Sequence, residues 1–158
     1  MRRYNLLAVV IMAAIAAGCG SPEDEQAAAS LRSALTSCSG NGCNGLDPST
    51  TTCQYDATTV RAIDIFRNGT NLKIGYVELR WSNTCGTNWS RVSRTDGAYA
   101  ESMTARVRRA DGLSYTDPYT GAGPMWSRMV YARGVCAWAW GLVDQSWTSG
   151  SNETLPAC

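Results

Sequence analysis

Short segments in which apolar and polar residues alternate recur along the chain from residue 60 to residue 143. This alternation is typical of half-buried β-strands. Five strands are predicted in this way, at 60–66, 76–81, 103–108, 127–133 and 135–143. Asn68-Gly69, directly after the first segment, is a strong hairpin turn signal. Because no segment has a convincing helical periodicity, the pattern predicts an all-β domain, a small barrel or sandwich of about five to seven short antiparallel strands.

The predicted strand at 135–143 carries no charged residue, which favours a central position in its sheet. Its alternation places Trp138 and Trp140 on the same face as Cys136, opposite valines and small residues. Large rings on an apolar strand face usually pack inward. We therefore expect Trp138, Trp140 and, on the strand at 76–81, Trp81 to lie in the core.

The N-terminal segment has the organisation of an export signal. Residues 1–18 begin with two arginines, continue as an apolar run too short to span a bilayer, and end in small residues before Cys19. The small residues and Cys19 resemble the bacterial lipobox, in which this cysteine is lipidated. We predict a lipoprotein signal peptide (1–18), a lipidated Cys19 with a flexible linker (19–37), and an extracytoplasmic β domain (38–158). Plain secretion is the alternative, and an outer-membrane position follows only if the source is Gram-negative.

Cysteine usage agrees with an extracytoplasmic location. The chain has seven cysteines, and lipidation of Cys19 leaves six for three disulfides in an oxidising compartment. The spacing alone leaves many pairings open, but a hairpin formed by the first two strands would place Cys53 and Cys85 at the same end. The expected bridges are therefore Cys53–Cys85, a local loop Cys38–Cys43, and Cys136–Cys158, which would hold the C-terminal tail.

Charge and composition exclude several classes of function. Without Arg2 and Arg3 the chain has twelve basic and thirteen acidic side chains, so nothing indicates a nucleic-acid partner. The chain has no histidine, which excludes Ser-His-Asp and Cys-His catalysis and histidine zinc sites. The sequence also has no phosphate-binding glycine loop. We therefore expect neither a cofactor nor a metal, and we assign no catalytic residue.

Three motifs together resemble a bacterial family of secreted or extracytoplasmic domains of unknown function, which also occurs C-terminal to membrane-bound helix-turn-helix regulators. The resemblance extends over most of residues 38–158 and implies compartment, β architecture and paired cysteines, but no catalytic residues. The motifs are Cys38-x4-Cys43-x-Gly45-x-Asp47-Pro48, then Cys53 with Asp56-Ala57-Thr58-Thr59, and Val77-Glu78-Leu79-Arg80-Trp81-Ser82-x-x-Cys85-Gly86-x-x-Trp89-x-Arg91.

The candidate binding residues are aromatic. The chain has six tryptophans and seven tyrosines but one phenylalanine. This bias favours aromatic rings whose polar group contacts water, as is common at binding surfaces. Trp126 and Trp147 lie in segments rich in Gly, Pro and Ser, where exposed binding residues tend to occur, and Arg128 is close to Trp126. By contrast, Asp47 and Asp117 precede prolines and are expected to shape turns, while Glu78 beside Arg80 is expected to form a surface ion pair.

These features favour a non-enzymatic, membrane-anchored envelope module that binds a cell-surface polymer or glycan through Trp126, Trp147 and Arg128. One alternative is a protein-interaction or inhibitor domain that meets an envelope protein through an edge strand or through Arg106 and Arg108. Another is a hydrolase that uses a pair of carboxylates, which needs no histidine.

Overall fold

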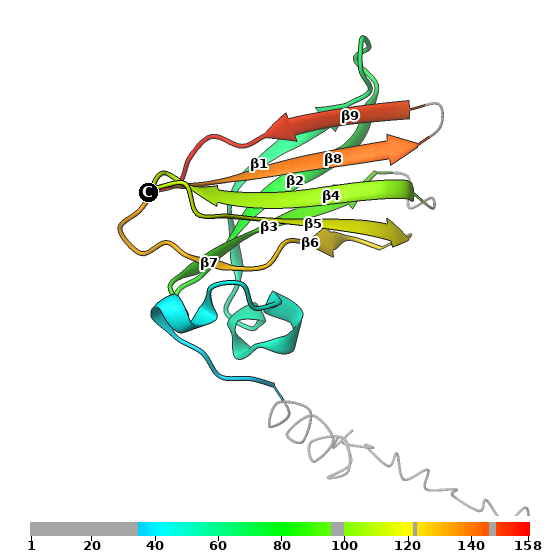
Figure 1. Ribbon diagram of the computed structural model, residues 1–158. Helices are drawn as coiled ribbons and strands as arrows, with labels where there is room; N and C mark the ends of the chain where they lie inside the picture. The colour runs from blue at the N-terminus through cyan, green and yellow to red at the C-terminus, as the bar shows by residue number, and fades with distance from the viewer. Residues whose placement is uncertain (1–34, 96–99, 122, 146–147) are drawn as a thin grey trace, which may run out of the picture. The chain divides into compact units, whose positions relative to one another are not determined.

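The computed structural model describes residues 35–158 except 96–99, 122 and 146–147 (Figure 1). In this part of the chain the fold is all-β, with helical structure limited to three short 3-10 turns ahead of the strands. The turns are η1 (Gly40–Cys43), η2 (Pro48–Thr50) and η3 (Thr52–Gln54). The strands are β1 (Thr58–Phe66), β2 (Lys73–Ser82), β3 (Thr87–Arg94), β4 (Ala100–Arg109), β5 (Ser114–Gly121), β6 (Met125–Trp126), β7 (Val130–Tyr131), β8 (Ala137–Gln145) and β9 (Thr148–Glu153).

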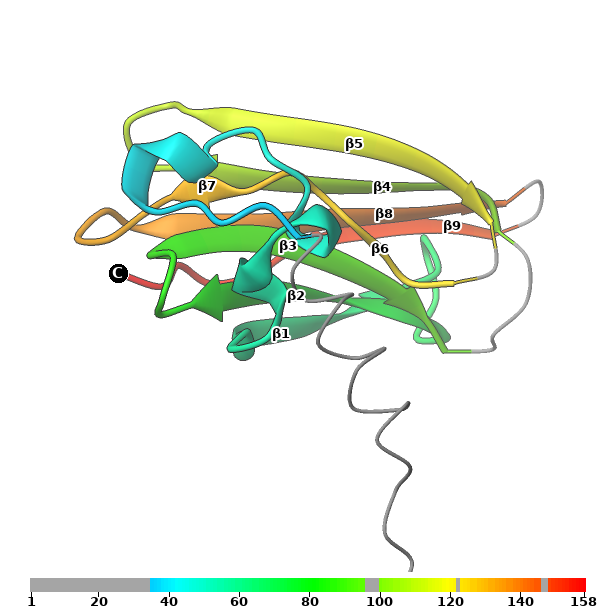
Figure 2. The same ribbon diagram turned by 90° about the horizontal axis from the view of Figure 1, so that it is seen from below.

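The strands form two antiparallel sheets that pack as a sandwich, which resolves the choice between barrel and sandwich. One sheet has the order β1-β2-β3-β6, with β7 also paired to β3, and the other has the order β5-β4-β8-β9. Figure 2 shows the two layers from another side, with β1, β2 and β3 in one layer and β5, β4, β8 and β9 in the other. An export signal or linker before residue 35 lies outside the described residues. Thr36, in the predicted linker, already hydrogen-bonds Thr50 and Thr52 through its backbone.

The predicted strands at 60–66, 76–81, 103–108 and 135–143 correspond to β1, β2, β4 and β8. The β1–β2 hairpin turns at Asn68-Gly69 as predicted, and Gly69 has a positive φ of 71°. The prediction of one strand over 127–133 is wrong, because only Val130–Tyr131 pairs there, with β3. The backbone before it departs from the sheet and hydrogen-bonds elsewhere, for example from Met129 N to Leu46 O.

The prediction that Trp138 and Trp140 lie in the core is also wrong. The face of β8 that points into the sandwich carries the small side chains of Ala137, Ala139 and Gly141, followed by Val143. Small residues let the two sheets approach closely, and the alternation of the strand then directs both indole rings to the outer face. Trp81 lies on the inward face of β2 and is half-buried.

Gly141 lies where β8 closely approaches the opposite sheet. A Cβ atom at this position would lie 2.7 Å from Val92 Cγ2 and 3.0 Å from Val77 Cβ. Gly141→Ala is therefore expected to destabilise the fold by about 1–3 kcal/mol through overpacking, measured by urea unfolding. Gly42→Ala is the control, because a Cβ there would have no atom within 4 Å. Equal unfolding midpoints for the two variants would contradict the close packing at Gly141.

Three disulfides connect the described residues, with the three pairings expected from the sequence. Cys38–Cys43 closes a loop around η1, and Cys53–Cys85 joins η3 to the turn between β2 and β3. Cys136–Cys158 holds the C-terminal residue beside the start of β8. The first two bridges, with Trp89 and Met129, form a second small core outside the sandwich. This second core attaches the 3-10 segments to the outer face of the five-stranded sheet.

Candidate functional site

Trp126 lies where the 3-10 segments meet the edge of the five-stranded sheet. Its strand, β6, pairs with β3 so that Trp126 lies opposite Arg91 and Met125 opposite Val92. Met125 and Val92 are core residues, so Trp126 and Arg91 face outward. The Trp126 ring is half-buried, and its Nε1 donates a hydrogen bond of 2.9 Å to Asp47 Oδ1. The sequence-predicted binding residue is therefore held in one orientation at the surface.

Two hollows meet at Trp126, and both are lined by this residue and Pro124. The first has a volume of about 170 Å³ and lies between β2, β3 and the 3-10 segments. The second has a volume of about 440 Å³ and extends from Trp126 towards β5. The first is also lined by Pro48, Ser49, Gln54, Ala57, Arg80, Trp89 and Arg91, and the second by Asp47, Asp117, Pro118, Tyr119, Met125 and Arg128. We call the two hollows together the Trp126 groove.

Asp47 fixes the indole ring. The residue before Pro48 caps η2, because Asp47 Oδ1 accepts hydrogen bonds from Ser49 N (2.8 Å) and Ser49 Oγ (2.7 Å). The expectation that Asp47 shapes a turn is correct, and its bond to Trp126 is an additional role. Partial burial raises the pKa of this carboxyl, but the hydrogen bonds from Ser49 and Trp126 outweigh burial and hold it below its usual value. Asp47 is therefore ionised at neutral pH.

A buried carboxylate organises the arginines of the first hollow. Glu78 on β2 is only 7% exposed, and its Oε2 lies 2.5 Å from Arg91 Nε on the neighbouring strand. Arg80, the partner expected from the sequence, lies further away at 4.0 Å and donates to Thr59 Oγ1 and Ala57 O. The expected surface ion pair is thus a largely buried network. Burial raises the pKa of Glu78, but hydrogen bonds from Arg91 and Thr59 lower it overall.

Arg128 and Asp117 contact each other where they line the second hollow. Asp117 Oδ2 accepts a hydrogen bond of 2.8 Å from Arg128 N, and Arg128 Nε lies 3.6 Å from Asp117 Oδ1. The Arg128 side chain is 58% exposed, so it is accessible to a ligand from solution. Asp117 does not shape its own turn as expected, because it lies inside the edge strand β5 and contacts the segment after β6.

The structure thus brings Trp126 and Arg128 to one groove, while Trp147 lies outside the described residues. Five further residues line the groove that the sequence did not indicate as binding residues: Asp47, Asp117, Arg80, Arg91 and Trp89. Asp47 is 79 residues away from its partner Trp126, and no local pattern indicates such a contact. The one sequence feature that could have indicated these residues is the pair of motifs that contain Asp47-Pro48 and Cys85-Gly86-x-x-Trp89-x-Arg91.

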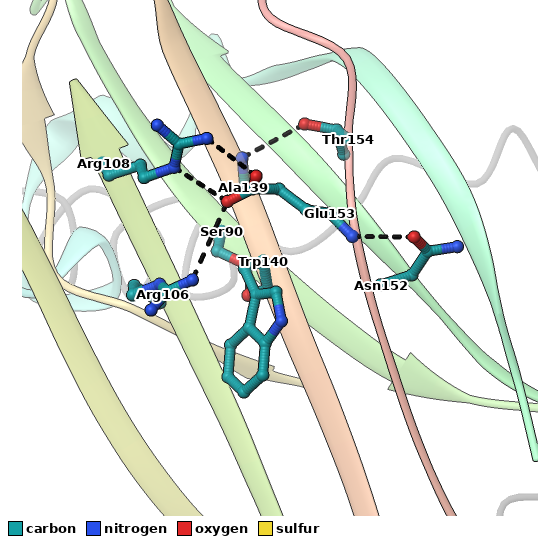
Figure 3. Close-up of polar contacts among 8 residues, drawn as sticks. All are labelled: Ser90, Arg106, Arg108, Ala139, Trp140, Asn152, Glu153 and Thr154. Carbon is teal, nitrogen blue, oxygen red and sulfur yellow. Dashed lines mark hydrogen bonds and ion pairs between the residues drawn. The ribbon is translucent and has the colours of Figure 1, made fainter. Parts of the chain in front are cut away.

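A second polar surface lies on the outer face of the other sheet, and we call it the Arg–Trp surface. Arg108 donates to both carboxylate oxygens of Glu153, at 2.8 and 2.7 Å, while Arg106 Nη2 lies 3.8 Å from the same group (Figure 3). The Arg106 guanidinium lies 4.8 Å from the Trp140 ring centroid, and Arg108 lies 4.3 Å from that of Trp138. This cation–π stacking explains how two indoles are accommodated on an outer face.

The fold and the disulfides define a class of protein: a disulfide-linked, two-sheet antiparallel β domain of the type found in oxidising compartments. Residues 41–140 match a family described as "Protein of unknown function (DUF2690)", and the chain belongs to this family. The residues that line the Trp126 groove lie within this range, whereas Glu153 lies outside it. No curated protein and no solved structure matches the chain.

Proposed function

We propose that this protein is a non-enzymatic binding module of the cell envelope that holds a glycan in the Trp126 groove. The observation that carries the proposal is the position of Trp126 between two open hollows, with ionic side chains on both sides. An indole face stacks on the apolar face of a sugar ring, while carboxylates and guanidiniums pair with sugar hydroxyls or acidic substituents. A ligand that extends past both sides of the ring would occupy both hollows.

The groove has the properties of a preformed site. Trp126, Asp47 and Ser49 are joined by hydrogen bonds, and Arg91 is fixed by Glu78, so binding would order few additional side chains. The charges are mixed: Arg80 and Arg91 line the first hollow with Glu78 as their ion-pair partner, and Arg128 lines the second with Asp47 and Asp117. This balance favours a hydroxyl-rich polymer over a strongly anionic one.

Catalysis by the same carboxylates has less support. A glycoside hydrolase of the two-carboxylate type needs one acid whose pKa is raised, so that it is protonated near neutral pH. Asp47 has the opposite property, because its hydrogen bonds hold its pKa below the usual value. Glu78, which lines neither hollow, likewise has a lowered pKa, and its carboxylate is occupied by Arg91 and Thr59. Binding without turnover is therefore the function that these carboxylates fit best.

The location belongs to the same proposal. Three disulfides indicate an oxidising, extracytoplasmic compartment. Among the described residues, no helix has the length and apolar character needed to cross a membrane. We propose that the protein is a lipoprotein held at a membrane by lipid on Cys19, and that the residues between Cys19 and Thr36 act as a tether. The tether would present the groove to polymers beyond the membrane surface.

Replacement of Trp126 tests the proposed site. Trp126→Ala is expected to weaken co-sedimentation of the protein with its polymer about thirtyfold, equivalent to ~2 kcal/mol, because it removes the stacking ring. The polymers to test are peptidoglycan, a cell-wall polymer and chitin. Trp140→Ala is the matched control, since this indole lies on the outer face of the other sheet. Unchanged binding by Trp126→Ala with loss in Trp140→Ala would assign the ligand to the Arg–Trp surface instead.

A protein partner at the Arg–Trp surface is the second candidate function, and one observation favours it. Arg106 Nε is buried and has no hydrogen-bond partner among the described residues, while its neighbour Arg108 takes both oxygens of Glu153. The Arg106 side chain as a whole is 39% exposed, so a partner's acidic side chain would pair with the accessible part of its guanidinium. Salt-sensitive capture of an envelope protein that Arg106→Ala abolishes and Trp126→Ala leaves intact would support this function.

A further inference from the structure

Two of the three disulfides lie against each other beneath the groove. Cys38 Sγ is 3.5 Å from Cys53 Sγ, although the two atoms belong to different bridges. All four sulfur atoms of Cys38, Cys43, Cys53 and Cys85 lie within 4.8 Å of one another, and all but Cys38 are buried. Cys38 lies just before η1, Cys43 ends η1, Cys53 lies in η3, and Cys85 lies in the turn between β2 and β3. The fold therefore gathers the four sulfur atoms of two bridges at one point.

Four sulfur atoms at these distances match a tetrahedral metal site. Zinc binds thiolates at about 2.3 Å, which places the sulfurs of a tetrahedral site about 3.8 Å from one another. The distance between Cys38 and Cys53 is already close to this value. On reduction, the bonded sulfurs of each pair need only move apart by rotation of their side chains, since the Cα atoms stay 5.3 and 5.7 Å apart.

We propose that, when both disulfides are reduced, Cys38, Cys43, Cys53 and Cys85 bind one zinc ion as a four-thiolate site. Reduction consumes two molecules of a dithiol: each transfers two electrons and two protons to one bridge and becomes a disulfide itself. Four protein thiols result. Binding of Zn²⁺ then releases four protons and leaves a zinc–thiolate centre with a net charge of −2. Thiolates select zinc and other soft or borderline ions over calcium or magnesium.

The site would hold together the same parts of the molecule that the disulfides hold. Cys43 and Cys53 belong to the 3-10 segments and Cys38 lies just before them, while Cys85 lies in the turn that joins β2 to β3. Asp47, which orients Trp126, lies between Cys43 and Cys53. A metal in this position keeps the groove assembled in a reducing environment, where the disulfides are lost. The proposal rests on the sulfur geometry and is independent of what the groove binds.

Cobalt(II) is the probe, because its visible spectrum reports tetrahedral thiolate coordination. The full-length protein carrying Cys19→Ser is purified in detergent, reduced with a phosphine under nitrogen, freed of reductant and titrated with Co²⁺. We expect visible d–d bands and a thiolate-to-metal charge-transfer band that saturate at one ion per chain and disappear when Zn²⁺ is added. In the reduced protein, Zn²⁺ is also expected to raise the melting temperature, because it binds the folded state.

Two further variants separate this site from nonspecific binding to thiols. Cys38→Ser with Cys53→Ser removes one sulfur from each bridge and should abolish the tetrahedral spectrum, whereas Cys136→Ser with Cys158→Ser should leave it intact. Equal spectra for both double variants would overturn the proposal. So would the absence of d–d bands in the parent protein, or a melting temperature of the reduced protein that does not respond to zinc.

Discussion

Replacing Cys53 and Cys85 together by serine is expected to lower the free energy of unfolding by about 4 kcal/mol. The bridge spans 32 residues, and the loss of loop-closure entropy on cross-linking the unfolded chain predicts a stabilisation of this size. The two cysteines are also buried in the second core, at 0 and 2% exposure, so the variant loses packing as well. Denaturant unfolding under oxidising conditions measures the change.

The control for this variant is the double replacement of Cys38 and Cys43. Their bridge spans only five residues, and the same relation predicts a loss of about 2 kcal/mol. If removal of the short bridge destabilises the protein as much as removal of the long one, chain entropy is not the main contribution, and packing of the second core is.

Glu78→Gln is expected to destabilise the protein by about 3 kcal/mol. The substitution preserves the shape of the side chain but removes its charge, which leaves the partly buried guanidiniums of Arg91 and Arg80 without their carboxylate. Asp64→Asn is the control on the same sheet. Its ion pair with Lys73 is exposed, and such pairs contribute less than about 1 kcal/mol. Similar unfolding energies for the two variants would contradict the role given to Glu78.

The effect of Glu78→Gln is also expected to depend on pH. Folding lowers the pKa of Glu78 below its ordinary value of 4.5, so the folded state favours the ionised form. The stabilisation is therefore fully present above the ordinary pKa and is lost as the pH falls through the lowered value. The difference in unfolding free energy between the parent protein and the variant should be constant from neutral pH to about pH 5 and shrink in more acidic solution.

The strands that could be predicted from the sequence are those with one face in the core and one face in solvent. β4 is the clearest example, since its alternation appears directly in Met103, Ala105 and Val107. β3 was not predicted because both of its faces carry polar residues, so its sequence lacks a clear alternation. Its outer face is nevertheless largely buried, because the 3-10 segments cover it and Arg91 is paired there with Glu78. β9 and β5 are edge strands, and β5 contains Pro118, which only an edge strand accommodates easily.

The orientation of β8 shows why an apolar pattern alone does not identify the core face. Trp138 and Trp140 alternate with residues as small as Ala139 and Gly141, and either face is apolar. The face with the small residues points into the core, because it lets β8 approach Val77 and Val92 of the opposite sheet. The indoles found partners outside, in arginines two strand positions apart on β4.

Only part of the candidate site could be predicted from the sequence, because its residues come from segments that are far apart in the chain. Trp126 and Arg128 could be selected because they lie close together in a segment rich in Gly, Pro and Ser. Their partners Asp47 and Asp117 lie on distant segments, and a turn residue has the same sequence signature whether or not it also orients a binding residue. Only the packing of the 3-10 segments on the sheet brings these groups together.

The most direct test of the proposed function follows the indole N–H groups during a titration. In heteronuclear NMR of the isotope-labelled protein, each of the six tryptophans contributes one indole signal, and Trp126→Phe assigns that of Trp126. Addition of soluble oligosaccharides from the polymer that sediments with the protein should shift the Trp126 signal most, because its N–H bonds to Asp47 in the groove. Shifts confined to Trp138 and Trp140, or no shift of any indole signal, would contradict glycan binding in the Trp126 groove.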